Sequence, residues 1–165
     1  MLEKSTASYR FGDLLGLARQ SWIHQMAASL AAVGYHDYRR SDAAVMRLLL
    51  RSPMPIGRLG EALGVTRQAA RKITDALERR GLATTARDEH DTRQINVSLT
   101  AEGEAYARSI VIVIERLNRD LCRRVDAVDL LAADRVLRAV LADVHTRELG
   151  ERIDPPPTPT LSDAR

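Results

Sequence analysis

Residues 56–103 read IGRLGEALGVTRQAARKITDALERRGLATTARDEHDTRQINVSLTAEG, and this stretch decides the fold. Its first part has apolar residues at helical spacing up to Leu63, and Gly64 then suits the left-handed position that ends a helix. Thr66 follows as an N-cap, and apolar residues at three- and four-residue spacing continue until Gly81. These signals predict a short helix and a longer helix joined by a tight turn.

The second half of the stretch has the periodicity of strands. Residues 82–86 and 94–99 both suit extended backbone, and the second segment alternates apolar and polar side chains. The charged loop 87–93 between them predicts a β-hairpin, and Thr100 is the expected N-cap of the next helix. A helix, a short helix, a glycine turn, a helix and a charged hairpin, in this order, predict a winged helix-turn-helix.

Helices are also expected before this unit. A first helix is predicted over about 11–32 and ends at Gly34. Ser41 is the expected N-cap of the next helix, which Pro53 ends, and Pro55 suits the first turn of the helix that follows.

Two further helices are predicted after Thr100, one to about Val125 and one over about 129–147. The β-branched run 110–114 is assigned to the first of them because strong helix formers flank it, and we expect it to be buried on several sides. The proline-rich residues 149–165 are expected to form a disordered tail.

The expected fold class is therefore mainly α with a small β-hairpin wing. The expected parts are an N-terminal dimerisation helix at 10–34, the winged helix-turn-helix DNA-binding domain at 41–103, C-terminal dimerisation helices at 104–148, and the tail. The last two helices carry more apolar surface than one small winged domain can cover, which predicts a homodimer. Their apolar residues are Leu117, Leu121, Val125, Leu130, Leu131, Val136, Leu137, Val140 and Leu141.

Composition and motifs exclude several classes of protein. The formal net charge is +3, from 25 basic and 22 acidic residues, which permits a nucleic-acid partner without requiring one. Cys122 is the single cysteine, so the chain has no internal disulfide and no cysteine zinc cluster, as suits a reducing cytoplasm. The sequence has no signal peptide, membrane-spanning run, phosphate-binding loop or nucleophile elbow, and its histidines lack metal-ligand spacing. We therefore expect a cytoplasmic protein that is no enzyme and holds no cofactor or metal.

The longer helix of the pair carries side chains suited to double-stranded DNA. In helix-turn-helix proteins the second helix enters the major groove and reads base edges near its N-terminal end. Arginine donates two hydrogen bonds to guanine, glutamine pairs with adenine in the same bidentate way, and free N–H groups in the first turn suit a phosphate. The side chains predicted to contact DNA here are Thr66, Arg67, Gln68, Arg71 and Lys72.

Lys72, Arg79 and Arg80 are expected to contact phosphates, which set affinity and register rather than sequence. The alternative interpretation is that these cations lie on an ordinary solvated helix.

The hairpin is expected to supply a second DNA contact. Arg93 is predicted to reach into a minor groove, where a narrow A·T-rich stretch concentrates negative potential. Asp91 is expected to hold Arg93 or to accept N–H groups of the turn, and Arg87 is also assigned to DNA. A solvated loop is the alternative.

These segments resemble the MarR (multiple-antibiotic-resistance-regulator) family over about residues 10–148. The family commonly has a hydroxyl residue where this chain has Arg71, so base reading and phosphate contact both remain open for that side chain. The matching residues are Leu59, Leu63-Gly64-Val65, Asp75-Ala76-Leu77-Glu78-Arg79-Arg80-Gly81-Leu82, Asp91-Thr92-Arg93 and Val97-Ser98-Leu99-Thr100-Ala101-Glu102-Gly103.

The resemblance implies a homodimer whose terminal helices intertwine and whose winged domains dock on the two halves of a pseudo-palindromic operator. Two-fold symmetry then places the reading helices about 34 Å apart. It also implies a transcriptional regulator, usually a repressor, that is released by a small aromatic or anionic effector or by oxidation. The alternative function is a winged-helix module for protein–protein contact without sequence-specific DNA binding.

The resemblance places an effector site between the dimer helices and the winged domain. An aromatic ring beside an arginine suits an aromatic carboxylate there. The alternative is that Trp22 belongs to the core of the dimer and that the other candidates only decorate helix ends. Cys122 is expected to be a buried, passive thiol, because the dipole at the C-terminal end of its helix opposes a thiolate. The candidate effector-binding residues are Trp22, His24, Tyr35, His36, Tyr38 and Arg39.

Overall fold

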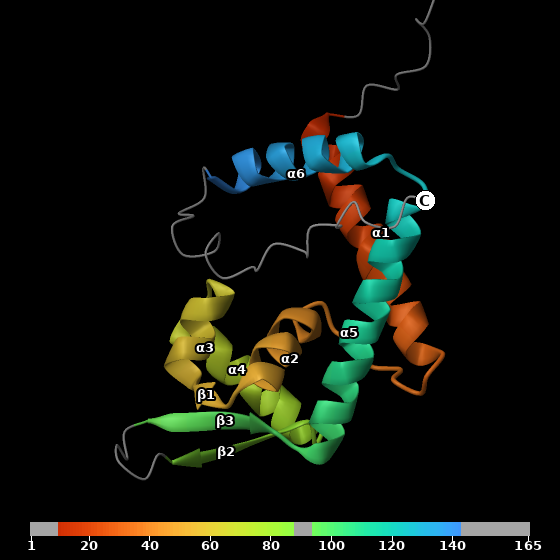
Figure 1. Cartoon of the computed structure of the whole chain (residues 1–165). Helices are drawn as coiled ribbons and strands as arrows, with labels where there is room; N and C mark the ends of the chain where they lie inside the picture. Colours follow the sequence, from red (N-terminus) through yellow and green to blue (C-terminus); the bar gives the residue numbers. More distant parts are fainter. Residues whose placement is uncertain (1–9, 88–93, 143–165) are drawn as a thin grey trace, which may run out of the picture.

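A computed structural model of the chain describes residues 10–87 and 94–142. The described residues are mainly helical with a small antiparallel sheet, which confirms the predicted fold class. In Figure 1, α5 runs the length of the molecule beside α1, while α6 and the hairpin lie at opposite ends. The elements are α1 (Phe11–Ala31), α2 (Asp42–Arg51), β1 (Met54–Pro55), α3 (Ile56–Leu63), α4 (Arg67–Arg79), β2 (Ala83–Arg87), β3 (Ile95–Leu99), α5 (Ala101–Cys122) and α6 (Ala127–Ala142).

The sheet has one strand more than the sequence predicts. Strands β2 and β3 form the predicted hairpin, with Thr85 opposite Val97, and β1 pairs with the other edge of β3, with Met54 opposite the same residue. A two-residue strand that ends in proline has no periodicity to reveal it. Pro55 was expected in the first turn of α3, but it is extended and precedes that helix, where a proline at a sheet edge loses no ladder bond.

Most of the predicted helix ends are confirmed. Gly64 has a left-handed φ of 64°, and Gly81 has a φ of 70° just after α4. The hydroxyl of Thr66 accepts the N–H of Ala69 at 3.2 Å, and that of Thr100 accepts the N–H of Gly103 at 3.0 Å.

Ser41 is the N-cap residue of α2, as predicted, but it does not cap the helix with its side chain. Ser41 has helical dihedral angles, and its side chain makes no capping bond. The carboxylate of Asp42 instead accepts the N–H of Arg39 at 3.1 Å. Arg39 precedes the helix, so this bond orders the chain before α2 and caps none of the N–H groups in its first turn.

One hydrophobic core joins a helical layer, formed by α1 and α5, to the winged domain, formed by α2 to β3. Met26 of α1, Met46 of α2, Val97 of β3, and Tyr106 and Ile110 of α5 are all fully buried in it. Apolar packing therefore continues from α1 and α5 through α2 to the sheet.

Two expectations for the C-terminal helices are wrong. The run 110–114 is helical, but Ile112 is 62% exposed and not buried on that side. Cys122 is exposed at the end of α5 and not buried, because α5 projects past the core there. In the single chain no core element covers these positions.

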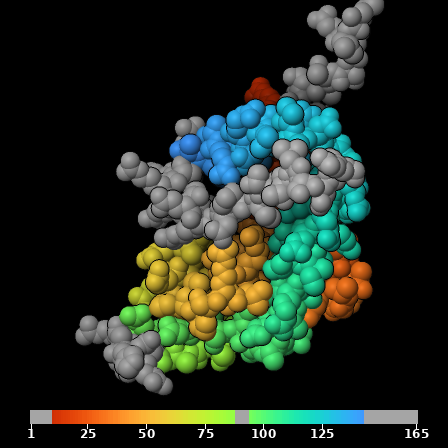
Figure 2. Space-filling model, viewed as in Figure 1, coloured from red at the N-terminus to blue at the C-terminus, as the bar shows by residue number. Residues whose placement is uncertain are grey.

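Helix α6 has no buried residue, and Figure 2 shows it on the surface at the end opposite the hairpin strands. The predicted extension of this helix to 147 and the tail at 149–165 lie outside the described residues. Within residues 10–87 and 94–142, no helix has the length and apolar character needed to cross a membrane.

The first turn of α5 leaves no room for a side chain at Gly103. A Cβ there would overlap the carbonyl oxygen of Leu82 and lie 2.8 Å from its carbonyl carbon. We expect Gly103→Ala to lower the free energy of unfolding by about 3 kcal/mol, measured by urea denaturation.

Gly57 in α3 is the matched control, because a Cβ there meets no atom within 4 Å. Gly57→Ala is expected to be neutral or stabilising by up to about 1 kcal/mol, since alanine has the higher helix propensity. Equal effects of the two substitutions would contradict the close approach of α5 to Leu82.

Candidate nucleic-acid interface

Helices α3 and α4 pack closely through a glycine. A Cβ on Gly60 would lie 3.1 Å from the carbonyl oxygen of Val65 and 3.3 Å from the Cβ of Ala70. The N–H of Val65 donates to the carbonyl of Gly60 at 2.9 Å, which closes the turn. The start of α4 is therefore held at a fixed angle to α3.

One face of α4 is packed and the other is open. Ala70, Thr74 and Leu77 are buried, and the hydroxyl of Thr74 donates to the carbonyl of Ala70 at 3.0 Å. The five residues predicted from the sequence to contact DNA are all exposed: Thr66 at the N-cap and Arg67, Gln68, Arg71 and Lys72 in the helix. We call this set the reading face.

Two side-chain pairs anchor the reading face and the sheet. Arg71 Nε lies 2.9 Å from Asp75 Oδ1, one helical turn away, which holds the guanidinium in place. The hydroxyl of Thr85 in β2 donates to Glu78 of α4 at 2.7 Å, so the hairpin is tied to the same helix.

Of the predicted hairpin contacts, Arg87 ends β2 and is exposed. Asp91 and Arg93 lie outside the described residues. Arg58 of α3 is a further exposed cation that the sequence analysis did not single out, since one charge on a short helix gives no pattern.

The predicted phosphate contact of Arg80 is wrong. Its side chain is 10% exposed and points inward, where Nη1 and Nη2 donate to the two carboxylate oxygens of Asp42 at 3.2 and 3.0 Å. Nη2 also donates to Asp37 Oδ1 at 2.9 Å, and Nε lies 2.6 Å from Asp37 Oδ2 in an ion pair that is not a hydrogen bond. Arg79, by contrast, is exposed.

Tyr106 of α5 completes this cluster. Its hydroxyl donates to Asp42 Oδ2 at 2.8 Å, and the guanidinium carbon of Arg80 lies 5.6 Å from the centre of its ring. Burial, together with the bond to Asp42, raises the pKa of Tyr106 well above its usual value. The hydrogen bond from Arg80 lowers the pKa of Asp37.

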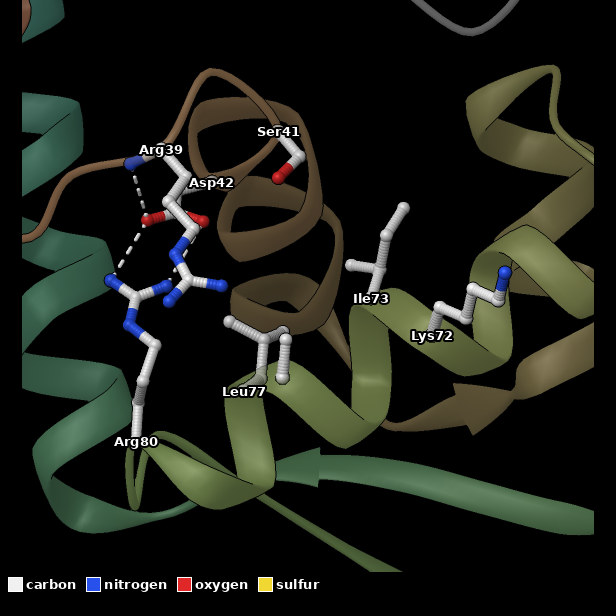
Figure 3. A pocket seen from close by; sticks show the side chains of 8 residues that line it. Arg39, Ser41, Asp42, Lys72, Ile73, Leu77 and Arg80 are labelled. Atoms are coloured by element: carbon white, nitrogen blue, oxygen red, sulfur yellow. Dashed lines mark hydrogen bonds and ion pairs between the residues drawn. The ribbon is translucent and has the colours of Figure 1, made fainter.

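Figure 3 shows a pocket of about 220 Å³ between the start of α2 and the side of α4. Asp42 and Arg80 form one end, and Lys72 lies at the other, beyond Ile73. The full lining is Arg39, Ser41, Asp42, Lys72, Ile73, Ala76, Leu77 and Arg80.

Of the candidate effector residues, Arg39 lines this pocket and the other five do not. Trp22 and Tyr38 are half-buried against the core, and His24 and His36 are exposed. The ring of Tyr35 packs on Tyr106 with 4.7 Å between centres. Across the described residues, no three histidine, cysteine, aspartate or glutamate side chains gather as metal ligands would.

Residues 36–94 match the model of the MarR family. This segment is therefore similar to MarR-family domains. The match begins within the connector between α1 and α2 (residues 32–41) and covers α2, β1, α3, α4 and β2. These elements include the helix that carries the reading face. No curated protein matches the chain.

Solved structures share the fold over most of the chain. The PcaV transcriptional regulator from Streptomyces coelicolor with its natural ligand has a TM-score of 0.68 at 23% identity, covering 87% of this chain and 99% of that chain. The S. aureus MepR–DNA complex has a TM-score of 0.73 at 16% identity, covering 83% and 100%. A mutant MarR from E. coli complexed with operator DNA has a TM-score of 0.67 at 20% identity, covering 79% and 92%. The elements outside the matched segment therefore also follow this fold.

The buried hydroxyl of Tyr106 predicts a loss of stability in alkali. The pKa of Tyr106 is raised in the folded chain. Its contribution to the free energy of unfolding is therefore fully present below the unfolded pKa of about 10 and is lost as the pH rises beyond that value. The unfolded chain then releases a proton that the folded chain keeps, which lowers the unfolding free energy by about 1.4 kcal/mol per pH unit.

We expect Tyr106→Phe to remove this part of the slope between about pH 10 and pH 11.5, as measured by urea denaturation at a series of pH values. The variant also loses one hydrogen bond to Asp42, but that loss lowers the unfolding free energy by the same amount at every pH in this range. Parallel curves for parent and variant across this range would contradict the assignment.

Proposed function

We propose that the chain is a sequence-specific DNA-binding transcriptional regulator that acts as a homodimer on a pseudo-palindromic operator, as a repressor. The observation that carries the proposal is the reading face, which is exposed on the second helix of a helix-turn-helix whose inner side is packed. The S. aureus MepR and E. coli MarR structures that share this fold are DNA complexes, which supports the same class of partner.

The reading face divides by chemistry into base readers and phosphate contacts. Arg67 and Gln68 lie in the first turn of α4, where side chains reach base edges, and Thr66 and Lys72 suit phosphates. We assign Arg71 to a base, because its bond to Asp75 uses Nε and leaves both Nη groups for the two acceptors of guanine.

The hairpin contributes the second DNA contact in this proposal. Arg87 lies at the exposed end of β2 and supports this assignment. Arg93 is assigned to the minor groove and Asp91 to holding the turn, as the sequence predicts.

Exposed apolar side chains on α1 and α6 support the homodimer. Helix α6 and the start of α1 lie at the end of the molecule away from the sheet, and large apolar side chains on them are exposed in the single chain. Leu117 is buried within its own chain and is removed from the predicted dimer surface. The exposed residues are Phe11, Leu14 and Leu17 of α1 and Val128, Leu131, Val136, Leu137, Val140 and Leu141 of α6.

A small aromatic or anionic effector remains part of the proposal. The residues assigned to it are Trp22, His24, Tyr38 and Arg39, which belong to α1 and to the connector that leads to α2. PcaV, which shares the fold, was crystallised with its natural ligand, which supports an effector as a class of partner.

Selection from a random duplex library at about 150 mM salt tests DNA reading. We expect an inverted repeat with half-sites about 10 bp apart. Arg67→Ala and Gln68→Ala are each expected to relax the preference at one base position by about 1–3 kcal/mol. Lys72→Ala is expected to weaken all sequences alike and to reduce the salt slope by about 1.

Arg108→Ala is the matched control, because Arg108 is an exposed cation on α5 and not on the reading face. It is expected to leave both the base preference and the salt slope as in the parent. If the parent enriches no sequence, even after unfolding and refolding to remove any bound ligand, the protein–protein module is the better assignment.

The dimer is tested separately by a charge on α6. Leu137→Glu is expected to shift the chain from dimer to monomer in sedimentation equilibrium, because a carboxylate buried in an apolar interface is left without a partner. Arg135→Glu places the same carboxylate at an exposed polar position of α6 and is expected to keep the dimer. Dimers of equal strength in both variants would remove α6 from the interface.

A further inference from the structure

Asp42, at the start of α2, is a carboxylate at which four separate segments meet. It is 2% exposed, yet it accepts hydrogen bonds from the guanidinium of Arg80, the hydroxyl of Tyr106 and the backbone N–H of Arg39. These donors come from the residue that caps α4, from α5 and from the connector after α1. One carboxylate therefore ties the reading helix to the helical layer.

Arg80 extends this link on its other side. Its Nη2 also donates to the carbonyl oxygen of Asp37 at 3.2 Å and to the carboxylate of Asp37 at 2.9 Å, and its guanidinium lies over the ring of Tyr106. The planar fork of the arginine thus bonds to two carboxylates at once, which a single ammonium group does not reproduce. We call Arg80, Asp42, Asp37 and Tyr106 the junction cluster.

Helices α4 and α5 make few direct contacts, and where the chain just after α4 meets the start of α5 the hydroxyl of Thr100 donates to the carbonyl oxygen of Gly81. Helix α4 packs mainly against α3 and β2, whereas α5 packs mainly against α2 and α1, and α4 has no extensive packing on α5. The junction cluster bridges this gap with short, charge-assisted bonds whose directions are restricted. Together with the contact at the start of α5, the cluster gives the end of α4 a second point of attachment to α5, and two attachment points fix an angle that one leaves free.

From this geometry we infer that Arg80 is a positioning residue: through Asp42 and Tyr106 it fixes the direction of the reading face relative to α5 and makes no contact with DNA itself. The consequence for DNA rests on the proposed function. The two reading faces of a dimer must match half-sites about 34 Å apart. If the angle between α4 and α5 varies in each chain, the dimer accommodates several spacings and its preference for one of them is weaker.

The first test does not involve DNA. Spin labels at Gln68→Cys on α4 and Arg108→Cys on α5, in a Cys122→Ser background, report the distance between the two helices, and dilution with unlabelled chain leaves only pairs within one chain. The parent is expected to give one narrow distance distribution. Combining Arg80→Met with Asp42→Asn removes both charges together, so no unpaired charge stays buried, and it is expected to broaden or split the distribution.

Arg80→Lys is the second variant, since it keeps the charge but loses the fork, and the same broadening is expected. Arg79→Met is the matched control, because Arg79 is the exposed neighbour, and it is expected to leave the distribution narrow. Narrow distributions in both Arg80 variants overturn the inference. If neither variant folds by circular dichroism, the cluster is a requirement for folding and not a positioning device, which also overturns it.

The second test uses the selected operator and versions with one base pair added or removed between the half-sites. The Arg80 variants are expected to bind the operator about tenfold more weakly, to lose most of the parent's discrimination between spacings, and to keep the parent's salt slope. A salt slope reduced by about 1, with the spacing preference intact, identifies Arg80 as a phosphate contact and overturns the inference. A parent that binds no operator, with distances that still broaden in the variants, refutes the proposed function and leaves the positioning role standing.

Discussion

The buried carboxylate of Asp42 has given up its hydration, and the protein must replace that water with fixed donors. Removing one partner of such a group leaves a charge in a poorly polarisable environment, which is far more costly than losing an exposed ion pair. The donors here come from the connector, the end of α4 and α5, so each of them is held to the others through one group. The winged domain and the helical layer share a core, but this carboxylate adds a directional constraint that apolar contacts lack.

Features that depend on a few neighbouring residues could be predicted from the sequence. The bond from Thr66 to the N–H of Ala69 spans three residues, and the left-handed turn at Gly64 needs one residue without a Cβ. The same is true of the exposed side of α4, since the helical period alone places Ala70 and Leu77 inward and Arg67 and Lys72 outward.

Features that depend on distant residues could not be predicted. Arg79 and Arg80 are identical in type and adjacent, and only the approach of Asp42, 38 residues away, separates an exposed cation from a buried one. Local rules predict a capping bond from the side chain of Ser41, which the structure does not have. They do not predict the bond to the neighbouring Asp42, because its donor Tyr106 is 64 residues away. Strand β1 exists only because β3 lies beside it. The pocket likewise exists only because α2 and α4 converge. The sequence therefore indicates Arg39 as a candidate effector residue but does not place Lys72 in the same site.

Helix α6 has no fully buried residue, so the part of the chain that the structure describes gives it little tertiary support, and its stability depends largely on local helix propensity. An isolated sixteen-residue helix is marginal in water, and a partner that covers it stabilises it by mass action. Under the proposed dimer, the order of this helix follows protein concentration. Newly made chains, while still dilute, then expose a frayed apolar segment to proteases, and assembled chains do not. Turnover would thus remove unpaired copies first and keep the pool of this regulator in its paired form.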